Sequence, residues 1–388
     1  MVNNQLTDSI YYIGVDDKDI DLFEGQYIVP NGLSYNSYLI VDEKIAVMDT
    51  VDLRKCDEWE RNLENALQGR DPDYLVVLHM EPDHAGSIGK FLEKYKTAKV
   101  VANARTFQMM PQFFENLNLD GRQVVVGEGD ELSLGQHTLS FVLAPMVHWP
   151  EVMMVYEKKE KILFSADAFG KFGALDTDEE WDCEARRYYL NIVGKYGVQV
   201  QAVLKKVAGL DIQKIYPLHG PVLTENLGYY INKYDIWSSY KPEDEGIFIA
   251  YTSIYGNTKN AVEKLKEILE RKGAKCVAIC DLAREDMAEA LEDAFRYDRL
   301  VLASPTYDGG VFPYMETFIN RLKSKNFQNR KVGFVENGSW APMAAKVMMN
   351  EMASLKNITL IEDKVTIKSA VKSTDMVQLE KLADALLA

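Results

Sequence analysis

The sequence predicts two domains, a mixed α and β domain followed by a doubly wound parallel sheet of the α/β class. The 388 residues are long enough for two domains that each bury a core. A stretch rich in proline, glycine and acidic residues, 238–246, separates the two halves. Regular alternation of strands and helices, typical of a parallel sheet covered on both faces, occurs in the second half. We therefore expect domains over residues 1–242 and 246–388.

Short apolar runs predict the strands of the first half, where many connections are short and typical of antiparallel pairs. Two strand-like pieces flank the turn signal Pro30-Asn31-Gly32 within residues 27–41. Further strands are expected over residues 45–49, 74–78, 124–126, 139–143, 152–156, 162–165 and 214–218. Helices are expected over residues 57–67 and 86–95 and, as one long amphipathic stretch, over 183–207.

The second half repeats one unit, a strand that runs into a helix. Strands are expected over residues 246–251, 275–280, 299–303, 331–335 and 359–361, and helices over 258–272 and 285–295. A doubly wound sheet binds its ligand at the carboxyl ends of its strands. The loops after these strands are therefore the candidate binding loops.

Composition excludes several classes of function. The net charge of −15 disfavours binding to a nucleic-acid backbone, which requires a basic face. No apolar run approaches the roughly 18 residues of a membrane span, and the first residues lack the pattern of a signal peptide. The four cysteines include no C-x2-C pair, which argues against an iron–sulfur or zinc-ribbon site in this chain. We expect a cytoplasmic protein.

The segment His79-Met80-Glu81-Pro82-Asp83-His84 follows an apolar strand and carries four side chains that bind metals. Its spacing is the H-x-H-x-D-H pattern of two-metal hydrolases, with Glu81 at the position of the second histidine. Imidazole-rich sites suit zinc, whereas an added carboxylate suits iron or manganese. The substitution therefore favours a redox metal.

Three more candidate ligands follow later strands: His148, Asp167 and His219. Each residue alone would more often be a hydrogen-bonded structural histidine or a helix cap. Four of the five histidines, however, stand at strand ends, and His137 is the exception. Together the seven side chains match a two-metal site in which one carboxylate is free to bridge.

Three loops of the second half have the composition of a site for a monophosphate and a planar ring. The first runs from a strand into a helix N-terminus, where hydroxyls and N–H groups bind anions. No nucleoside-triphosphate or dinucleotide motif is present. An ordinary strand-to-helix turn, and core positions for the aromatics Tyr307 and Trp340, are the alternatives. The expected contact residues are Thr252, Ser253, Ile254, Tyr255, Gly256, Asn257, Thr258, Pro305, Thr306, Tyr307, Asp308, Gly309, Asn337, Gly338, Ser339 and Trp340.

Given the ligand pattern, the first half resembles the metallo-β-lactamase fold, an αββα sandwich. That resemblance implies that His79, Glu81 and His148 hold one ion, that Asp83, His84 and His219 hold the other, and that Asp167 is shared. The three loops of the second half resemble those of flavodoxin, which binds FMN at this place.

The whole chain resembles the flavodiiron proteins (A-type flavoproteins), also through Tyr35-Asn36-Ser37-Tyr38-Leu39, His148-Trp149-Pro150 and Ser165-Ala166-Asp167-Ala168-Phe169-Gly170. The resemblance implies two iron ions and FMN as cofactors. It implies reduction of dioxygen to water or of nitric oxide to nitrous oxide. It also implies a head-to-tail homodimer, or a dimer of dimers. Because no rubredoxin is fused to this chain, we expect a separate rubredoxin or a similar protein as electron donor.

Two departures from some relatives lie near the pocket and leave the choice between dioxygen and nitric oxide open. Lys171-Phe172-Gly173 stands where certain members carry a histidine, and the segment between Asp167 and His219 is shorter than in several relatives. Two other functions compete with the flavodiiron interpretation. One is a dinuclear zinc hydrolase with an attached flavin domain, and the other is an electron carrier with a decayed metal site.

Overall fold

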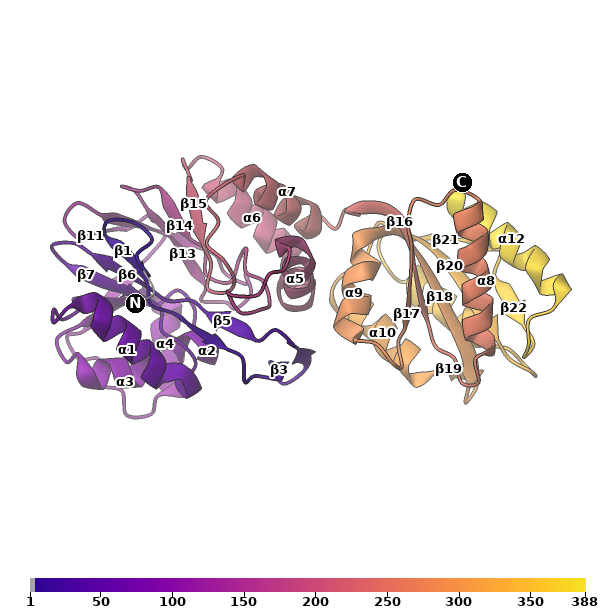
Figure 1. The fold of residues 1–388 in the computed structure, drawn as a ribbon, viewed down its shortest axis with the longest axis horizontal. Coiled ribbons are helices and arrows are strands. Elements are labelled where there is room, and N and C mark those ends of the chain that lie inside the picture. Colours follow the sequence, from indigo (N-terminus) through magenta and orange to yellow (C-terminus); the bar gives the residue numbers. More distant parts are fainter. Residues whose placement is uncertain (1–3) are drawn as a thin grey trace. The chain divides into compact units, whose positions relative to one another are not determined.

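The computed structural model describes residues 4–388 and divides into two compact units, which Figure 1 draws in sequence colours. The first unit comprises the chain up to Tyr189 together with Val198–Tyr234. The second comprises Leu190–Gly197 and Asp235–Ala388. The domain ranges 1–242 and 246–388 stay a prediction. No helix within residues 4–388 has both the length and the apolar character that a membrane span requires.

Two sheets form the core of the first unit. The six-stranded sheet has the order β1-β6-β7-β8-β9-β10, and the five-stranded sheet has the order β11-β12-β13-β14-β15. The strands of the first are β1 Ile10–Tyr12, β6 Tyr38–Val41, β7 Ile45–Met48, β8 Tyr74–Val76, β9 Lys99–Asn103 and β10 Gln123–Val126. Those of the second are β11 Glu131–Ser133, β12 Thr138–Leu143, β13 Met153–Glu157, β14 Ile162–Phe164 and β15 Lys214–Tyr216. Two small antiparallel pairs join β2 Val15–Asp17 to β5 Leu33–Tyr35 and β3 Leu22–Phe23 to β4 Tyr27–Ile28.

Helices cover both sheets, which gives the expected αββα sandwich (Figure 1). The helices are α1 Cys56–Leu67, α2 Pro82–Ala85, α3 Ile88–Lys94, α4 Ala104–Phe113, α5 Trp181–Tyr188, α6 Gly197–Val207 and α7 Leu227–Ser238. α1 contacts β6 and α4 contacts β9, while side chains of α6 share a cavity with those of β13 and β14. The helical spacing of Trp59, Leu63 and Leu67 places all three in the core under α1.

The amphipathic stretch expected over residues 183–207 is helical throughout, but its helical geometry changes along the chain. α5 ends at Tyr188, and a π-helical turn over Tyr189–Val193 and a 3₁₀ turn over Gly194–Tyr196 precede α6. Gly197 begins α6, and a Cβ there would lie 2.3 Å from the carbonyl oxygen of Ser238. The chain passes too close to α7 at this point for another residue type.

The second unit is the expected doubly wound sheet, with the order β17-β16-β18-β20-β21 and parallel pairing throughout that path. β19 pairs with β18, and β22 pairs with β20. The strands are β16 Asp244–Tyr251, β17 Val277–Asp281, β18 Tyr297–Tyr307, β19 Gly310–Val311, β20 Lys331–Asn337, β21 Thr359–Leu360 and β22 Val365–Ile367. The helices are α8 Asn257–Arg271, α9 Met287–Arg296, α10 Pro313–Ser324, α11 Ala344–Ala353 and α12 Ser373–Leu387.

The helices of this unit lie on two faces of the sheet (Figure 1). α8 and α12 contact each other, and Leu265 and Leu382 share a buried core with Ile249 and Val301 of the sheet. α9, α10 and α11 contact one another in sequence order. The carboxyl ends of the central strands therefore remain open for a ligand.

Candidate metal centre and cofactor pocket

The ligand loop connects β8 to the short helix α2, and Pro82 occupies the first turn of that helix. His79 and Glu81 precede the helix, whereas Asp83 and His84 lie on it. Proline has a fixed φ that suits the first turn of a helix. Pro82 therefore favours a change from loop to helix at this position. This change brings the four candidate ligands of one short segment to the same side.

The end of β7 fixes this loop from the neighbouring strand. Asp49 Oδ1 accepts hydrogen bonds from the backbone N–H groups of Leu78 and His79 at 2.8 and 3.4 Å. The Thr50 backbone and hydroxyl both donate to the carbonyl oxygen of His84, at 2.9 and 2.6 Å. These bonds tie both ends of the loop to a buried strand.

The structure gathers the seven predicted residues into two buried groups that can each hold a metal ion. The first contains His79, Glu81, His148 and Asp167. His148 Nε2 lies 2.9 Å from Glu81 Oε2 and 3.1 Å from Asp167 Oδ2. His79 Nε2 lies 3.2 Å from Glu81 Oε2 and 3.4 Å from Asp167 Oδ2. Two imidazole nitrogens and two carboxylate oxygens therefore converge on one point.

The second group contains Asp83, His84 and His219. His84 Nε2 lies 3.1 Å from His219 Nε2 and 3.3 Å from Asp83 Oδ2, and His219 Nε2 lies 3.2 Å from the same oxygen. Asp167 Oδ1 faces this group at 3.1 Å from His84 Nε2. Since its Oδ2 atom faces the first group, Asp167 lies between the two.

The donor set fits two metal ions. Both oxygens of Asp83 and Oδ1 of Asp167 are buried without a hydrogen-bond donor in the described part of the chain. The Nδ1 atom of His219 lies 2.7 Å from the carbonyl oxygen of Ser34, which fixes the tautomer with its lone pair on Nε2. Buried carboxylates without donors, facing imidazole lone pairs, are costly unless cations neutralise them. Mixed carboxylate and imidazole ligands suit iron.

In the metal-free protein, the raised pKa values of two ligand histidines also indicate that this site favours positive charge. Burial lowers the pKa of His148, but hydrogen bonds to Asp167 and Glu81 outweigh it and raise that pKa to about 9. Burial likewise opposes a charge on His79, yet Asp167, Glu151 and Glu81 hold its pKa well above the ordinary value. Without metal, protons on His79 and His148 neutralise nearby carboxylates, so a bound metal must displace them.

Two buried residues that the sequence analysis missed lie against the ligands. Glu151 contacts His79, and the ring of Tyr188 lies 5.5 Å from that of His219. Burial, and then the charges of Asp167 and nearby carboxylates, raise the pKa of Tyr188 well above its ordinary value. Glu151 follows His148-Trp149-Pro150, so proximity to a ligand was its only sequence signal. His137, as expected, lies outside both groups and contacts Glu157.

In the second unit, a cavity of about 500 Å³ opens at the carboxyl ends of the strands. Gly256, with a φ of +83°, precedes α8 and turns the chain into the helix. Asn257 and Thr258 at the N-terminus of this helix line the cavity, and a helix N-terminus suits a phosphate. The predicted residues that line the cavity are Ser253, Ile254, Tyr255, Asn257, Thr258, Pro305, Thr306, Asp308, Gly309, Asn337, Gly338, Ser339 and Trp340.

Three predicted contact residues do not line this cavity. Thr252 is buried and donates its hydroxyl hydrogen to Ser304 Oγ at 3.2 Å, and Gly256 only shapes the turn. Tyr307 packs against Phe312 with ring centroids 5.5 Å apart. The cavity also includes residues that sequence reasoning missed: Ala341, Met343 and Ser369. Ser369 follows β22, so the rule that ligands bind at strand ends would have found it.

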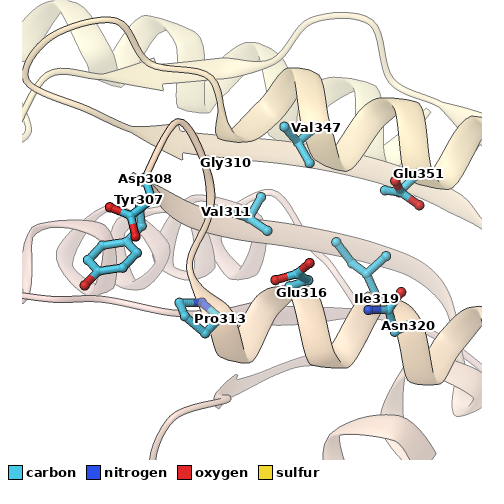
Figure 2. A pocket seen from close by; sticks show the side chains of 10 residues that line it. All are labelled: Tyr307, Asp308, Gly310, Val311, Pro313, Glu316, Ile319, Asn320, Val347 and Glu351. Atoms are coloured by element: carbon cyan, nitrogen blue, oxygen red, sulfur yellow. The ribbon is translucent and has the colours of Figure 1, made fainter.

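Tyr307 instead lines a second cavity of about 300 Å³, shown in Figure 2. The turn with Tyr307 and Asp308 closes one end, and Glu316 and Ile319 of α10 face Val347 of α11. Asp308 lines both cavities, so the turn is the wall between them. The contact of Tyr307 with a flavin therefore stays a prediction.

Known proteins match both units. The ODP family beta lactamase model matches residues 33–220, and a flavodoxin domain model matches residues 248–370. The chain is 28% identical to nitric oxide reductase of Moorella thermoacetica, over 99% of this chain and 98% of that protein. It is 30% identical to anaerobic nitric oxide reductase flavorubredoxin of Escherichia coli, over 86% of this chain and 71% of that protein. Rubredoxin oxygen:oxidoreductase of Desulfovibrio gigas is 26% identical, with a TM-score of 0.91 over 99% of this chain and 98% of that chain.

The fold and the site define an oxidoreductase in which a domain of the metallo-β-lactamase type precedes a flavodoxin domain. This order, and the similarity along nearly the whole chain, identify its family. The chain belongs to the flavodiiron proteins.

Proposed function

We propose that the protein reduces dioxygen to water or nitric oxide to nitrous oxide at a diiron centre, with electrons relayed by FMN. The observation that carries this proposal is the placement of Asp167 between two groups of metal-binding side chains. The proposed iron ligands are His79, Glu81, Asp83, His84, His148, Asp167 and His219. Two ferrous ions and a two-electron-reduced FMN, when bound, supply the four electrons that dioxygen requires, while two nitric oxide molecules require two.

The residues around the site support such a reduction by controlling protons. In the metal-free protein, burial raises the pKa of Asp49, which lies beside the backbone of His79, to about 8. The Tyr188 hydroxyl is buried and keeps its proton. Both reductions consume protons, and these groups place proton donors within the protein near the ligands.

The cofactor cavity supports FMN binding with a helix N-terminus for the phosphate and aromatic side chains for the ring. Trp340 and Tyr255 line the cavity and are 83% and 91% exposed. Large aromatic surfaces of this kind can cover a flavin ring. We infer that Trp340 contacts the ring.

The electron donor is inferred from the relatives, which include a rubredoxin oxygen:oxidoreductase. We propose a separate rubredoxin or a similar protein. The basic segment 320–325, with Arg330 and Lys331, gives little support for a docking surface. Arg330 is buried and donates to the carbonyl oxygens of Phe295 and Tyr297, and Lys323 pairs with Glu351 at 2.6 Å. A cytoplasmic location and a head-to-tail homodimer, or dimer of dimers, belong to the same proposal.

Metal and flavin analysis tests this function against a zinc hydrolase. The protein is purified without added metal, and iron, zinc and FMN are measured per chain. Gas consumption is then followed with reduced rubredoxin as donor. We expect two irons and one FMN per chain and consumption of dioxygen or nitric oxide. Full zinc occupancy with hydrolase activity and no gas consumption would overturn the proposal, and bound flavin without gas consumption would indicate an electron carrier.

A further inference from the structure

Glu151 is a buried carboxylate that contacts a proposed iron ligand without belonging to the ligand set. It is 1% exposed. Its Oε1 atom lies 2.8 Å from His79 Nδ1 and accepts a hydrogen bond of 2.9 Å from the backbone N–H of Met80. One oxygen atom therefore fixes both the ring of His79 and the backbone that follows it.

A hydrogen bond also fixes the backbone of Glu151. The Asn103 side chain donates a hydrogen bond of 2.6 Å to the carbonyl oxygen of Glu151. The other end of the same side chain caps α4 by accepting from the N–H groups of Arg105 and Thr106. Glu151 Oε2 is buried and has no donor within residues 4–388, so Oε1 is the atom through which the carboxylate contacts its neighbours.

Within residues 4–388, neither histidine of the second group has a carboxylate at Nδ1. Nδ1 of His219 contacts the neutral carbonyl oxygen of Ser34 at 2.7 Å. Nδ1 of His84 is buried without a hydrogen-bond partner among the described residues. The two groups thus differ in charge beyond their direct ligands.

We propose that Glu151 is a positioning residue that makes the two iron positions electronically different. The proposal rests on the diiron function proposed above. A carboxylate partner fixes the tautomer of a ligating histidine and makes it a stronger donor. Because that donor strength favours the ferric state, an iron held by His79 would be the harder one to reduce. An iron held by His84 and His219 would then have the higher reduction potential.

The variant E151Q removes the negative charge of the side chain and leaves its packing nearly unchanged. Glutamine has nearly the same size, and its carbonyl oxygen can still accept from Met80 and His79. The matched control is E157Q. Glu157 is 0% exposed, lies 3.0 Å from His137 Nδ1 and accepts from the backbone N–H groups of two neighbouring residues, but it lies outside the proposed ligand set.

Mössbauer spectra of the ⁵⁷Fe-loaded protein, in the diferric and the one-electron-reduced states, give the readout. We expect E151Q to change the parameters of one iron and to leave those of the other unchanged. The reduction of the altered iron should move to higher potential, and iron affinity should fall about 10- to 100-fold. E157Q should give the spectra and potentials of the wild-type protein.

Unchanged iron parameters in E151Q, equal changes at both irons, or the same change in E157Q would each overturn the proposal. If E151Q does not fold or does not bind iron, the variant E151D provides the test. Aspartate keeps the negative charge, but its shorter side chain places that charge farther from His79. A shift at one iron in E151D supports the proposal, and an unchanged spectrum overturns it. Failure of the wild-type protein to bind two irons would instead overturn the proposed function.

Discussion

The Nε2 atoms of His84 and His219 lie 3.1 Å apart in the buried interior of the first unit. Because Nδ1 of His219 contacts the Ser34 carbonyl, the neutral His219 ring has its lone pair on Nε2. Asp167 Oδ1 lies at the same 3.1 Å from His84 Nε2. We interpret this convergence of nitrogen and oxygen atoms as a metal position rather than as a hydrogen-bonded network.

The position of Asp167 between the two groups predicts that it affects both metals. D167N removes the charge that faces both groups with little change in size. We expect iron to fall from two to below one per chain and turnover to fall at least about 100-fold. Iron analysis and gas consumption provide the measurement. D211N, at an exposed carboxylate, is the control, and full iron content in D167N would contradict a bridging role.

Iron binding to the metal-free protein should depend on pH. His148 has its pKa raised from 6.5 to about 9, so it retains a proton that iron must displace. The apparent affinity should therefore increase by about tenfold per pH unit for each displaced proton and level off above pH 9. Competition with a chelator at several pH values measures it. An affinity that does not change between pH 6.5 and 9 would show that the ring is not a ligand.

The same shift predicts how the stability of the metal-free protein depends on pH. A pKa that folding raises stabilises the folded state below the unfolded value of 6.5, and this stabilisation is lost as pH rises through about 9. Thermal unfolding of the metal-free protein should therefore occur at lower temperature at pH 9 than at pH 6.5. H148N should flatten this dependence, and an unchanged slope in that variant would contradict the assignment.

The flavin cavity predicts different effects for two exposed aromatic residues. Trp340 lines the cavity, whereas Tyr307, which is 44% exposed, faces the neighbouring one. Loss of an aromatic contact of about 1.4 kcal/mol weakens binding about tenfold. We expect W340A to weaken FMN binding by about this factor and Y307A by less than about twofold. Flavin fluorescence quenching measures both affinities, and equal losses would place Tyr307 in the site after all.

The proposed head-to-tail dimer predicts that two inactive chains restore activity together. One chain carries D167N in its metal site, and the other carries substitutions that abolish FMN binding. In mixed dimers, the intact flavin of the first chain serves the intact metal site of the second. We expect activity to return after the chains are mixed under conditions that exchange subunits. No recovery despite confirmed mixed dimers would contradict the arrangement.

The sequence was sufficient to predict the seven clustered residues because all of them lie in the segments that follow strands β8, β12, β14 and β15. A strand fixes the position of its last residue, so His148, Asp167 and His219 converge once the sheets form. Asp49 and Glu151 were missed because their contacts with the ligand loop join distant segments. A sequence pattern within one segment does not indicate a contact between two distant segments.

Other differences also have physical causes. The amphipathic pattern over 183–207 indicated a helical stretch, but it carries no signal for the π-helical and 3₁₀ turns between α5 and α6. The contact of Tyr307 with a flavin stays a prediction, because its side chain lines the neighbouring cavity and a sequence cannot tell which side of a turn carries a side chain. β22, and Ser369 in the loop after it, were missed because the three-residue run Val365–Ile367 is too short for a periodic signal.

Gas consumption by the wild-type protein loaded with iron and FMN tests the central claim most directly. Reduced rubredoxin supplies electrons, and an electrode follows dioxygen or nitric oxide. Our account predicts that four electrons are used per dioxygen molecule, or one per nitric oxide molecule, and that turnover is lost when iron is removed. Oxidation of rubredoxin without consumption of either gas, or equal turnover with and without iron, would contradict it.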